Sequence, residues 1–188
     1  RHNLYAKYME NCIVHVRKNL YADYLVNCNV YCDGEVQVRS GRGIIIGGTI
    51  RSARKISAQT IGSRSENTTT IYLGGQPCAD YERNAFQKRI DELNKEIKRI
   101  ERQPESPTKA KQMNKARLEL SVTQMKLAQF DKDLEKLKKS LDEQGGCRLQ
   151  CDLAYPGLKL TIGADTLHLT KETSYVNGRL VDGEVRVL

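Results

Sequence analysis

Heptad-spaced apolar residues run from Phe86 to Leu141, between two stretches of short apolar segments that are punctuated by glycine. A period of about 3.5 residues is typical of helices that pack along one stripe, whereas short glycine-bounded apolar segments are typical of β-strands. This order predicts a β-structure that helices interrupt and that resumes after them. We therefore expect a mainly β fold: a single-stranded parallel β-helix interrupted by an antiparallel coiled-coil hairpin.

This pattern predicts three segments. We expect residues 1–78 to form the first part of the β-helix, residues 79–145 the helical hairpin, and residues 146–188 returning strands that complete or cap the β-helix. The chain opens at Arg1 without a methionine and already in strand-like sequence, so we interpret it as a piece of a longer protein.

The β-helix prediction depends on the spacing of aliphatic residues in the first segment. Several steps are about six residues long, which fits neither a helix nor one long alternating strand. Glycines stand where turns with positive φ are needed. A β-sandwich of hairpins is the competing interpretation, but it predicts longer steps between turns. The spaced residues are Val14, Leu20, Leu25, Val30, Val36, Ile44, Ile50, Ile56, Ile61 and Ile71.

Strand signals return after the helical segment. Alternation over Leu158–Ile162 predicts a strand with one buried face, and further strands are expected at Leu167–Thr170 and around Val185. Asn177-Gly178 and Asp182-Gly183 are expected to be turns between them. These strands could pair as an antiparallel cap that protects the end of the β-helix.

The middle segment contains two apolar stripes separated by prolines. Pro104 and Pro107 are expected to end the first helix, and Gly145-Gly146 the second. Helices joined by so short a link are expected to be antiparallel neighbours. The first stripe comprises Phe86, Ile90, Leu93, Ile97 and Ile100, and the second Met113, Ala116, Leu120, Thr123, Leu127, Phe130, Leu134, Leu137 and Leu141.

The amino-acid composition excludes few classes of function. The chain has 31 Lys and Arg against 23 Asp and Glu, a net charge of +8 that favours acidic partners in general. Its longest apolar run, Ile44–Ile46, is far too short to span a membrane. The six cysteines do not suggest a disulfide-stapled miniprotein, and we expect reduced thiols, as in a cytoplasm.

The segments Gly43–Ser63 and Thr70–Gly74, with their Gly-Gly-x-Ile and Ile-Gly-Ser elements, resemble the bacterial flagellar assembly protein A (FapA) family. The resemblance extends from about Cys12 to Ile162 and includes the strand at Tyr155–Gly157. It implies a cytoplasmic protein without known catalytic residues, linked in some members to flagellar assembly or its polar placement. The β-helix is also similar to the C-terminal domain of MinC and, more loosely, to bactofilins.

No catalytic, cofactor or metal site is expected from the residues. Cys28/Cys32 and Cys147/Cys151 could supply four zinc thiolates, but residues four apart in a strand lie too far apart to share an ion. Cys78 and Cys147 bracket the helices, and two reduced thiols are expected there rather than a disulfide. His15 is expected to be a wall residue of the β-helix, in contrast to the catalytic histidine of hexapeptide acyltransferases.

Basic residues of the first segment form a candidate interaction surface for an acidic protein partner: Arg39, Arg42, Arg51, Arg54, Lys55 and Arg64. Stacked coils could align them into a stripe, and the lack of aromatic residues in that stretch disfavours nucleic acid. We therefore expect a non-enzymatic scaffold that binds proteins, with self-association through the hairpin or the β-helix. The alternatives are a MinC-like or bactofilin-like self-assembling module and a hexapeptide-type acyltransferase.

Overall fold

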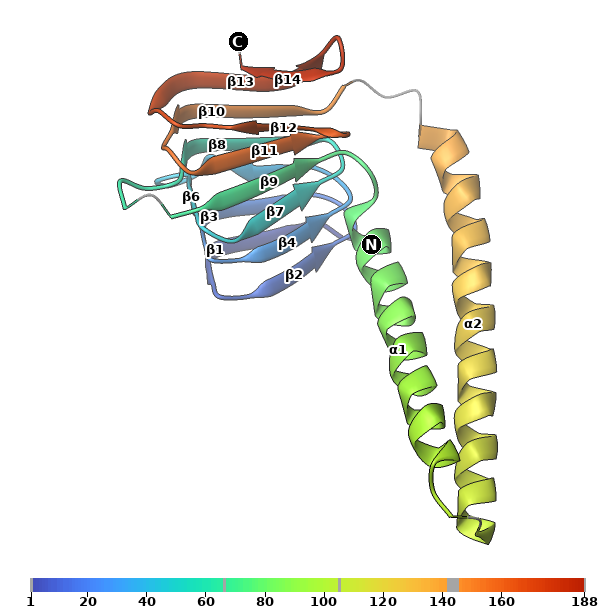
Figure 1. Ribbon diagram of the computed structural model, residues 1–188. Helices are drawn as coiled ribbons and strands as arrows, with labels where there is room; N and C mark the ends of the chain where they lie inside the picture. Colours follow the sequence, from blue (N-terminus) through green and yellow to red (C-terminus); the bar gives the residue numbers. More distant parts are fainter. Residues whose placement is uncertain (1, 66, 105, 142–145, 188) are drawn as a thin grey trace. The chain divides into compact units, whose positions relative to one another are not determined.

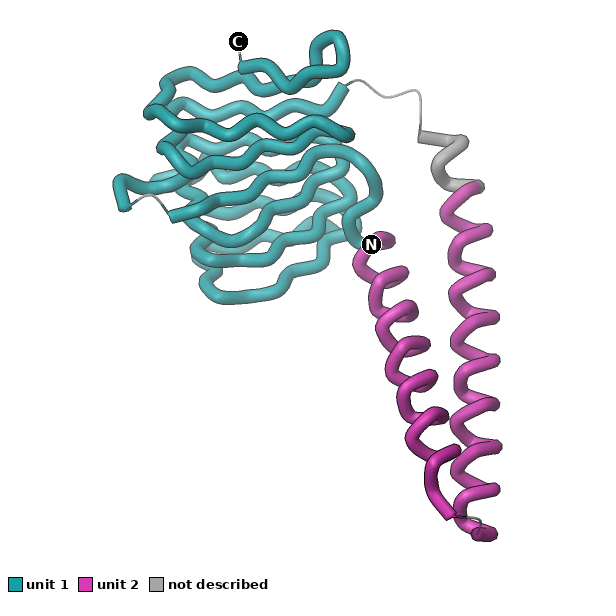
Figure 2. The backbone as a smooth tube through the Cα atoms, in the orientation of Figure 1, with its two compact units in different colours: residues 1–78, 145–188 teal, residues 79–144 magenta. Residues whose placement is uncertain are grey.

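The computed structural model describes the backbone of residues 2–65, 67–104, 106–141 and 146–187, with side chains described throughout except over 136–141. The chain divides into two compact units (Figure 2). Residues 1–78 and 145–188 form the first unit, and residues 79–144 form the second. The β-strands belong to the first unit, and most of the helical residues belong to the second (Figure 1).

Within the described residues, the strands of the first unit form two sheets that the chain visits in turn (Figure 1). The first sheet contains β1 (Leu4–Glu10), β3 (Leu20–Val26), β5 (Val36–Val38), β6 (Ile44–Ile46), β8 (Lys55–Ile61), β10 (Arg148–Ala154), β13 (Thr173–Val181) and β14 (Glu184–Val187). The second sheet contains β2 (Ile13–Val16), β4 (Asn29–Cys32), β7 (Thr49–Ser52), β9 (Thr69–Leu73), β11 (Leu158–Ile162) and β12 (Asp165–His168).

The pairing of strands in successive coils is parallel. Leu4 pairs with Leu20, Leu20 with Val36 and Val36 with Ile56, so the first coils repeat after 16, 16 and 20 residues. These pairings confirm a β-solenoid and exclude a sandwich of hairpins for this part of the chain. The expected six-residue repeat is wrong, because inward residues of two sheets interleave along the sequence and many of those steps cross between sheets.

The first two coils are also an internal sequence repeat. The sequence Leu4-Tyr-Ala-Lys-Tyr returns as Leu20-Tyr-Ala-Asp-Tyr, and Asn11-Cys12 returns as Asn27-Cys28. Because the offset equals the length of one coil, identical residues lie side by side in neighbouring strands. Asn11 and Asn27 both take positive φ, 52° and 49°, a conformation that asparagine tolerates better than most residues.

The core lies between the two sheets and consists of aliphatic columns that cross the coils. One column on the first sheet runs through Leu20, Val36, Ile56 and Leu149, all of them fully buried. The facing column on the second sheet runs through Val30, Ile50, Ile71 and Leu160. Since burial of apolar area is the main favourable term in folding, these columns stabilise the solenoid.

The helices are inserted at one corner of the solenoid without shifting its register. The corner between β7 and β8 is only Ala53-Arg54, and the equivalent corner between β9 and β10 contains both helices. The Gly74 amide donates to the Ser52 carbonyl at 2.9 Å, and the Arg148 amide donates to the Arg54 carbonyl at 3.2 Å. The residues after the helices therefore rejoin the solenoid, and β10 pairs in parallel with β8.

Antiparallel strands cover the last coil, as expected. β12 pairs with β11 and β13 pairs with β10 in this sense, and β14 follows β13 through a turn at Asp182-Gly183. The expected turn at Asn177-Gly178 is wrong, because both residues lie inside β13. A Cβ atom on Gly178 would be 2.5 Å from Leu160 Cδ2, so this glycine makes room for a core residue. The strand expected at Leu167–Thr170 is shifted to Asp165–His168.

The second unit contains most of α1 (Pro77–Glu101) and α2 (Pro107–Leu141), which the prolines separate as expected. Several side-chain pairs join the two helices. From one pair to the next, the residue number increases along α1 and decreases along α2: Arg83 with Asp131, Phe86 with Phe130, Arg89 with Glu119, and Glu101 with Arg117. The side chains of Leu137 and Leu141, which are expected in the second stripe, lie outside the described residues, as does the segment 142–145 that leads to the expected helix end at Gly145-Gly146. No helix in the described ranges is long and apolar enough to cross a membrane.

Candidate interaction surface

The basic residues expected to form a stripe are distributed over both sheets. Arg51 projects from β7 in the second sheet, whereas Lys55 begins β8 in the first sheet. The others lie in connecting segments, with Arg39 and Arg42 between β5 and β6, Arg54 at the corner before β8, and Arg64 after β8. They therefore do not share one column of the solenoid. Lys55 is instead paired with Arg148, a basic neighbour that comes from beyond the helices.

Arg51 belongs to a column of outward side chains with aromatic neighbours. Its guanidinium carbon lies 4.6 Å from the ring centroid of Tyr31 and 5.2 Å from that of Tyr72. On the next coil, the His15 ring stacks on Tyr31 with centroids 5.0 Å apart and planes at 12°. The Arg51 Nη1 atom is buried without a hydrogen-bond partner among the described residues, so the ring faces are its main neighbours.

This column changes the argument about nucleic acid. Aromatic residues are absent from the sequence around Arg51, but the register brings Tyr31 and Tyr72 to it from the neighbouring coils. Stacking on a base needs a free ring face, and both faces of the Tyr31 ring are occupied, by His15 and by Arg51. The arrangement therefore stabilises the sheet and offers no base-stacking platform at Tyr31.

Arg39 is held against the first sheet by polar contacts. It forms an ion pair with Asp152 of β10, and its Nη2 atom donates to the Ala58 carbonyl at 3.3 Å. The Gln59 side chain in turn donates to the Arg39 carbonyl at 2.7 Å. Asp152 is remote in sequence and follows the helices, so only the sheet register could have identified it as the partner. This ion pair partly neutralises the expected basic surface.

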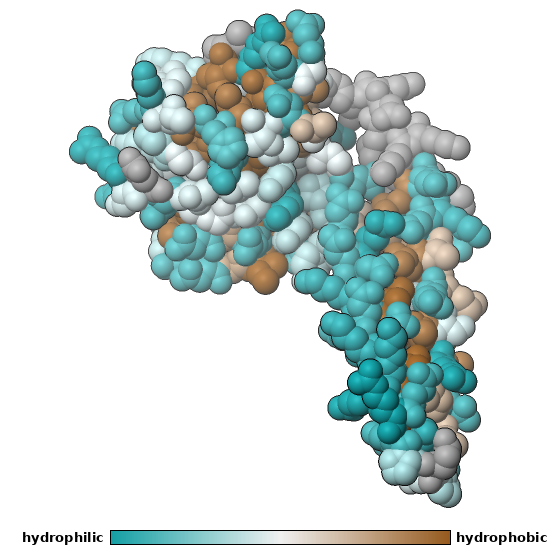
Figure 3. Space-filling model, viewed as in Figure 1, coloured by the Kyte–Doolittle hydropathy of each residue, from teal (hydrophilic) through white to brown (hydrophobic). Residues whose placement is uncertain are grey.

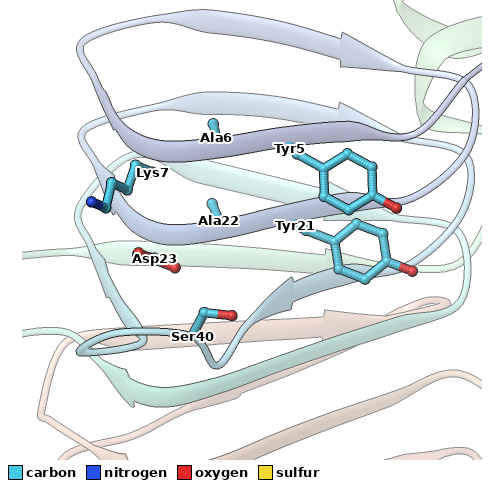
Figure 4. Close-up of a pocket in the computed structure, with 7 residues that line it drawn as sticks. All are labelled: Tyr5, Ala6, Lys7, Tyr21, Ala22, Asp23 and Ser40. Carbon is cyan, nitrogen blue, oxygen red and sulfur yellow. The ribbon is translucent and has the colours of Figure 1, made fainter.

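An open pocket of about 300 Å³ lies on the outer face of the first sheet, near β1 (Figure 4). Tyr5 and Tyr21 stack beside it with ring centroids 4.8 Å apart and planes at 8°. Lys7 and Asp23 lie on the other side, and the pocket also includes Ser40. One edge of this pocket is thus aromatic and the other carries both signs of charge.

The cysteines are free thiols, and those considered for zinc have separate partners. Cys32 donates to the Lys18 carbonyl at 3.0 Å, whereas Cys147 lies 3.5 Å from the Ala53 carbonyl. Burial, followed by the nearby Asp152 carboxylate, raises the pKa of Cys151 to about 12, and burial raises the pKa of Cys78 to about 12. A thiol with so high a pKa is protonated near neutral pH and is a poor metal ligand or nucleophile. In the described part of the chain, no cluster of three potential ligands is found.

The helix α2 presents a second apolar stripe besides the one that contacts α1. Between the helices, apolar side chains form a continuous band (Figure 3). Away from that band, Leu118, Val122 and Met125 are 68%, 41% and 69% exposed. Their spacing of four and three residues places them on one side of α2. The heptad pattern alone did not reveal this second stripe, since it emphasises the stronger one.

The family model of the Flagellar Assembly Protein A beta solenoid domain matches residues 1–185. This match agrees with the solenoid and its inserted helices. Comparisons with curated proteins and with solved structures found no similar protein. On the strength of the family match over nearly the whole chain, this protein belongs to the flagellar assembly protein A family.

Proposed function

We propose that this chain is a non-enzymatic scaffold that acts in flagellar assembly or in the polar positioning of the flagellum, with a cytoplasmic location. Membership of the family supports the flagellar role. The interior of the solenoid supports the absence of catalysis, because aliphatic columns fill it and Cys151, whose pKa burial raises to about 12, is buried there. A scaffold needs a surface that binds protein, and the exposed stripe of α2 is the observation that supports one.

In this proposal the helices form an antiparallel coiled coil, and the stripe of Leu118, Val122 and Met125 binds the same stripe of a second copy. An exposed leucine or methionine gains about 1.5–3 kcal/mol from complete burial, so the stripe favours a partner with an apolar face. Antiparallel pairing about the middle of the stripe would place Leu118 opposite Met125 of the second copy.

Charges beside the stripe favour a second copy over an unrelated helix. In the same pairing, Glu119 would face Lys126 of the other copy, and this attraction would occur twice. One oxygen of Glu119, Oε1, already accepts from Arg89 at 2.5 Å, which leaves Oε2 for the lysine. Ser121 on the opposite side of the stripe is small, so it permits close approach of the two helices. Lys111 and Lys132 lie beyond the stripe and would limit the contact to its apolar part.

The experiment is sedimentation velocity of the whole chain over a range of concentrations. We expect a monomer–dimer equilibrium, which Leu118→Gln combined with Met125→Gln abolishes. Lys126→Glu should weaken the dimer by placing like charges opposite each other. Lys95→Glu, an equal change of charge at an exposed position on α1, should leave it unchanged. A monomer at every concentration, or equal effects of the two lysine variants, would contradict self-association through this stripe.

The flagellar role needs a separate test in the source bacterium. Replacement of the chromosomal copy by the Leu118→Gln, Met125→Gln variant should reduce the number of correctly placed flagella seen by electron microscopy. The Lys95→Glu strain is the control, and matched protein levels are checked by immunoblot. Normal flagella in a strain that lacks the protein altogether would contradict the proposed role.

A self-assembling module of the MinC or bactofilin kind is the second candidate. It is favoured by the order of the sheets, in which β1 and β2 are terminal strands and could pair with another chain. The opposite end of the solenoid carries the antiparallel strands β12, β13 and β14, which disfavour continued end-to-end growth. Open-ended polymers in the sedimentation experiment, unaffected by the α2 variants, would favour this candidate.

A further inference from the structure

The thiols of Cys12 and Cys28 meet at the corner where the first sheet passes into the second. Their sulfur atoms are 3.9 Å apart. Cys28 is fully buried, whereas Cys12 is only half-buried. The pair arises from the internal repeat, since the two residues are 16 positions apart, the length of one coil.

The backbone at this corner already has the separation that a disulfide needs. The Asn29 amide donates to the Cys12 carbonyl at 2.8 Å, and the next residues, Ile13 and Asn29, are paired in the parallel ladder. Neighbouring strands lie about 4.8 Å apart, within the range of about 4.4–6.8 Å between the Cα atoms of bonded cysteines. The sulfur atoms can therefore approach bonding distance through side-chain rotation.

Three of the four other thiols contact backbone carbonyl groups elsewhere in the fold. Cys32 donates to Lys18 and Cys78 to Tyr31, at 3.0 Å and 3.2 Å, and Cys147 lies near Ala53. Cys12 and Cys28 also lie near carbonyl groups, those of Glu10 and Val26, but in addition they contact each other.

We propose that Cys12 and Cys28 are a site of reversible oxidation, at which a small-molecule disulfide such as glutathione disulfide converts the two thiols into one intramolecular disulfide. This inference does not depend on the proposed function. In a reducing compartment a disulfide between such residues is transient, so the pair would respond to the thiol–disulfide balance and would not be a permanent staple.

The reaction proceeds by two thiol–disulfide exchanges. The half-buried Cys12, as its thiolate, attacks one sulfur of glutathione disulfide, and one glutathione thiolate leaves. Cys28, once deprotonated, then attacks the Cys12 sulfur of this mixed disulfide and displaces the second glutathione. Two protein thiols are thereby oxidised and one glutathione disulfide is reduced to two glutathione molecules, with the two thiol protons passing to them.

Burial raises the pKa of Cys28 and so disfavours it as the first nucleophile, which leaves the first attack to the more exposed Cys12. In the second step the attacked sulfur is already beside Cys28, so proximity favours the exchange. The product joins β2 to β4 through their adjoining corners and connects the first coil covalently to the second. Opening of the first coil would then depend on the oxidation state of the pair, since a crosslink restricts the opened chain.

The test is incubation of the whole reduced chain with glutathione disulfide, followed by alkylation of remaining thiols and intact-mass measurement. We expect one species that has lost two hydrogen atoms and retains four alkylated thiols. Tryptic mapping should join the peptide Tyr8–Arg17 to the peptide Asn19–Arg39. Because the second peptide also contains Cys32, the mapping is repeated with Cys32→Ser, which should still form the crosslink.

Variants separate the two steps. Cys12→Ser should form no crosslink, whereas Cys28→Ala should accumulate glutathione on Cys12. The crosslinked wild type should unfold at a higher temperature than the reduced protein, and dithiothreitol should reverse the shift. A stable glutathione adduct on the wild type, loss of the crosslink in Cys32→Ser, or no reaction at Cys12 would each overturn the proposal.

Discussion

The guanidinium group of Arg51 lies over the ring of Tyr31, with its central carbon 4.6 Å from the ring centroid. The two residues come from neighbouring coils and are directly paired in the register of β4 and β7. A residue expected to belong to a binding surface thus has a structural role in the sheet. Its other ring contact, with Tyr72 at 5.2 Å, extends the same column to a third coil.

Removal of this side chain should therefore destabilise the solenoid. Cation–π contacts contribute about 0.5–1 kcal/mol at exposed sites and about 2 kcal/mol when desolvated, so we expect Arg51→Ala to lower the free energy of unfolding by about 1–2 kcal/mol. Urea denaturation followed by circular dichroism measures the change. The control is Arg54→Ala, an exposed arginine with the same charge, for which a change within about 0.5 kcal/mol is expected. Equal effects of the two variants would show that the ring contacts contribute nothing.

Gly48 and Gly163 allow a matched test of crowding between coils. Both have positive φ, +72° and +65°, so alanine introduces similar backbone strain at each site. A Cβ atom on Gly48 would be 2.6 Å from the Cys28 backbone nitrogen, whereas one on Gly163 meets nothing within 4 Å. We expect Gly163→Ala to cost about 1–2 kcal/mol of unfolding free energy, and Gly48→Ala clearly more. The measurement is thermal and urea unfolding of both variants. A smaller loss for Gly48→Ala would mean that the corners of the coils can move apart freely.

The buried thiols should make the solenoid less stable in alkaline solution. In the folded chain the pKa of Cys151 is about 12, whereas an unfolded cysteine titrates near about 8.5. Between these values the folded state holds the proton and the unfolded state has lost it, so the free energy of unfolding falls as the pH rises. Cys151→Ala removes this contribution. The slope of unfolding free energy against pH should therefore be less steep than in the wild type, by up to about 1.4 kcal/mol per pH unit above about pH 9.

Urea titrations at several pH values measure both slopes. Lysine and tyrosine residues also titrate in this range, but they are common to both proteins and cancel in the difference. Parallel slopes for the wild type and Cys151→Ala would contradict the raised pKa. The slope of unfolding free energy against pH should also be less steep in Cys32→Ala than in the wild type, because burial raises the pKa of Cys32 to about 11.

Local patterns were sufficient for the main elements of the fold. The heptad stripe predicted the helices, and the prolines predicted their separation, because both signals act within a few residues. Asp182-Gly183 predicted a turn correctly, since both residues tolerate the positive φ that such turns require, 53° and 85° here. Asn177-Gly178 carries the same local signal but lies within β13. Its glycine is explained by Leu160, which comes from another strand.

The predicted number of residues in one coil was wrong for a related reason. Six-residue steps between aliphatic residues mix positions of two sheets, and the true offset appears only when whole coils are compared. Comparison of Leu4–Tyr8 with Leu20–Tyr24 would have shown it, because identical residues recur there. The later coils have no such identity, and their longer repeat becomes visible only in the pairing of Val36 with Ile56.

The amino-acid sequence by itself determined that strands are interrupted by helices and then resume, because turn residues, prolines and apolar periodicity act over short distances. Only the tertiary structure decided which side chains of different coils become neighbours. Arg51 meets Tyr31 and Tyr72, Arg39 meets Asp152, and Cys12 meets Cys28 through the lateral register of the coils. The physical reason is that this register is set jointly by the packing of the aliphatic columns and the hydrogen bonds between strands. Both of these connect residues that lie one or more coils apart along the chain.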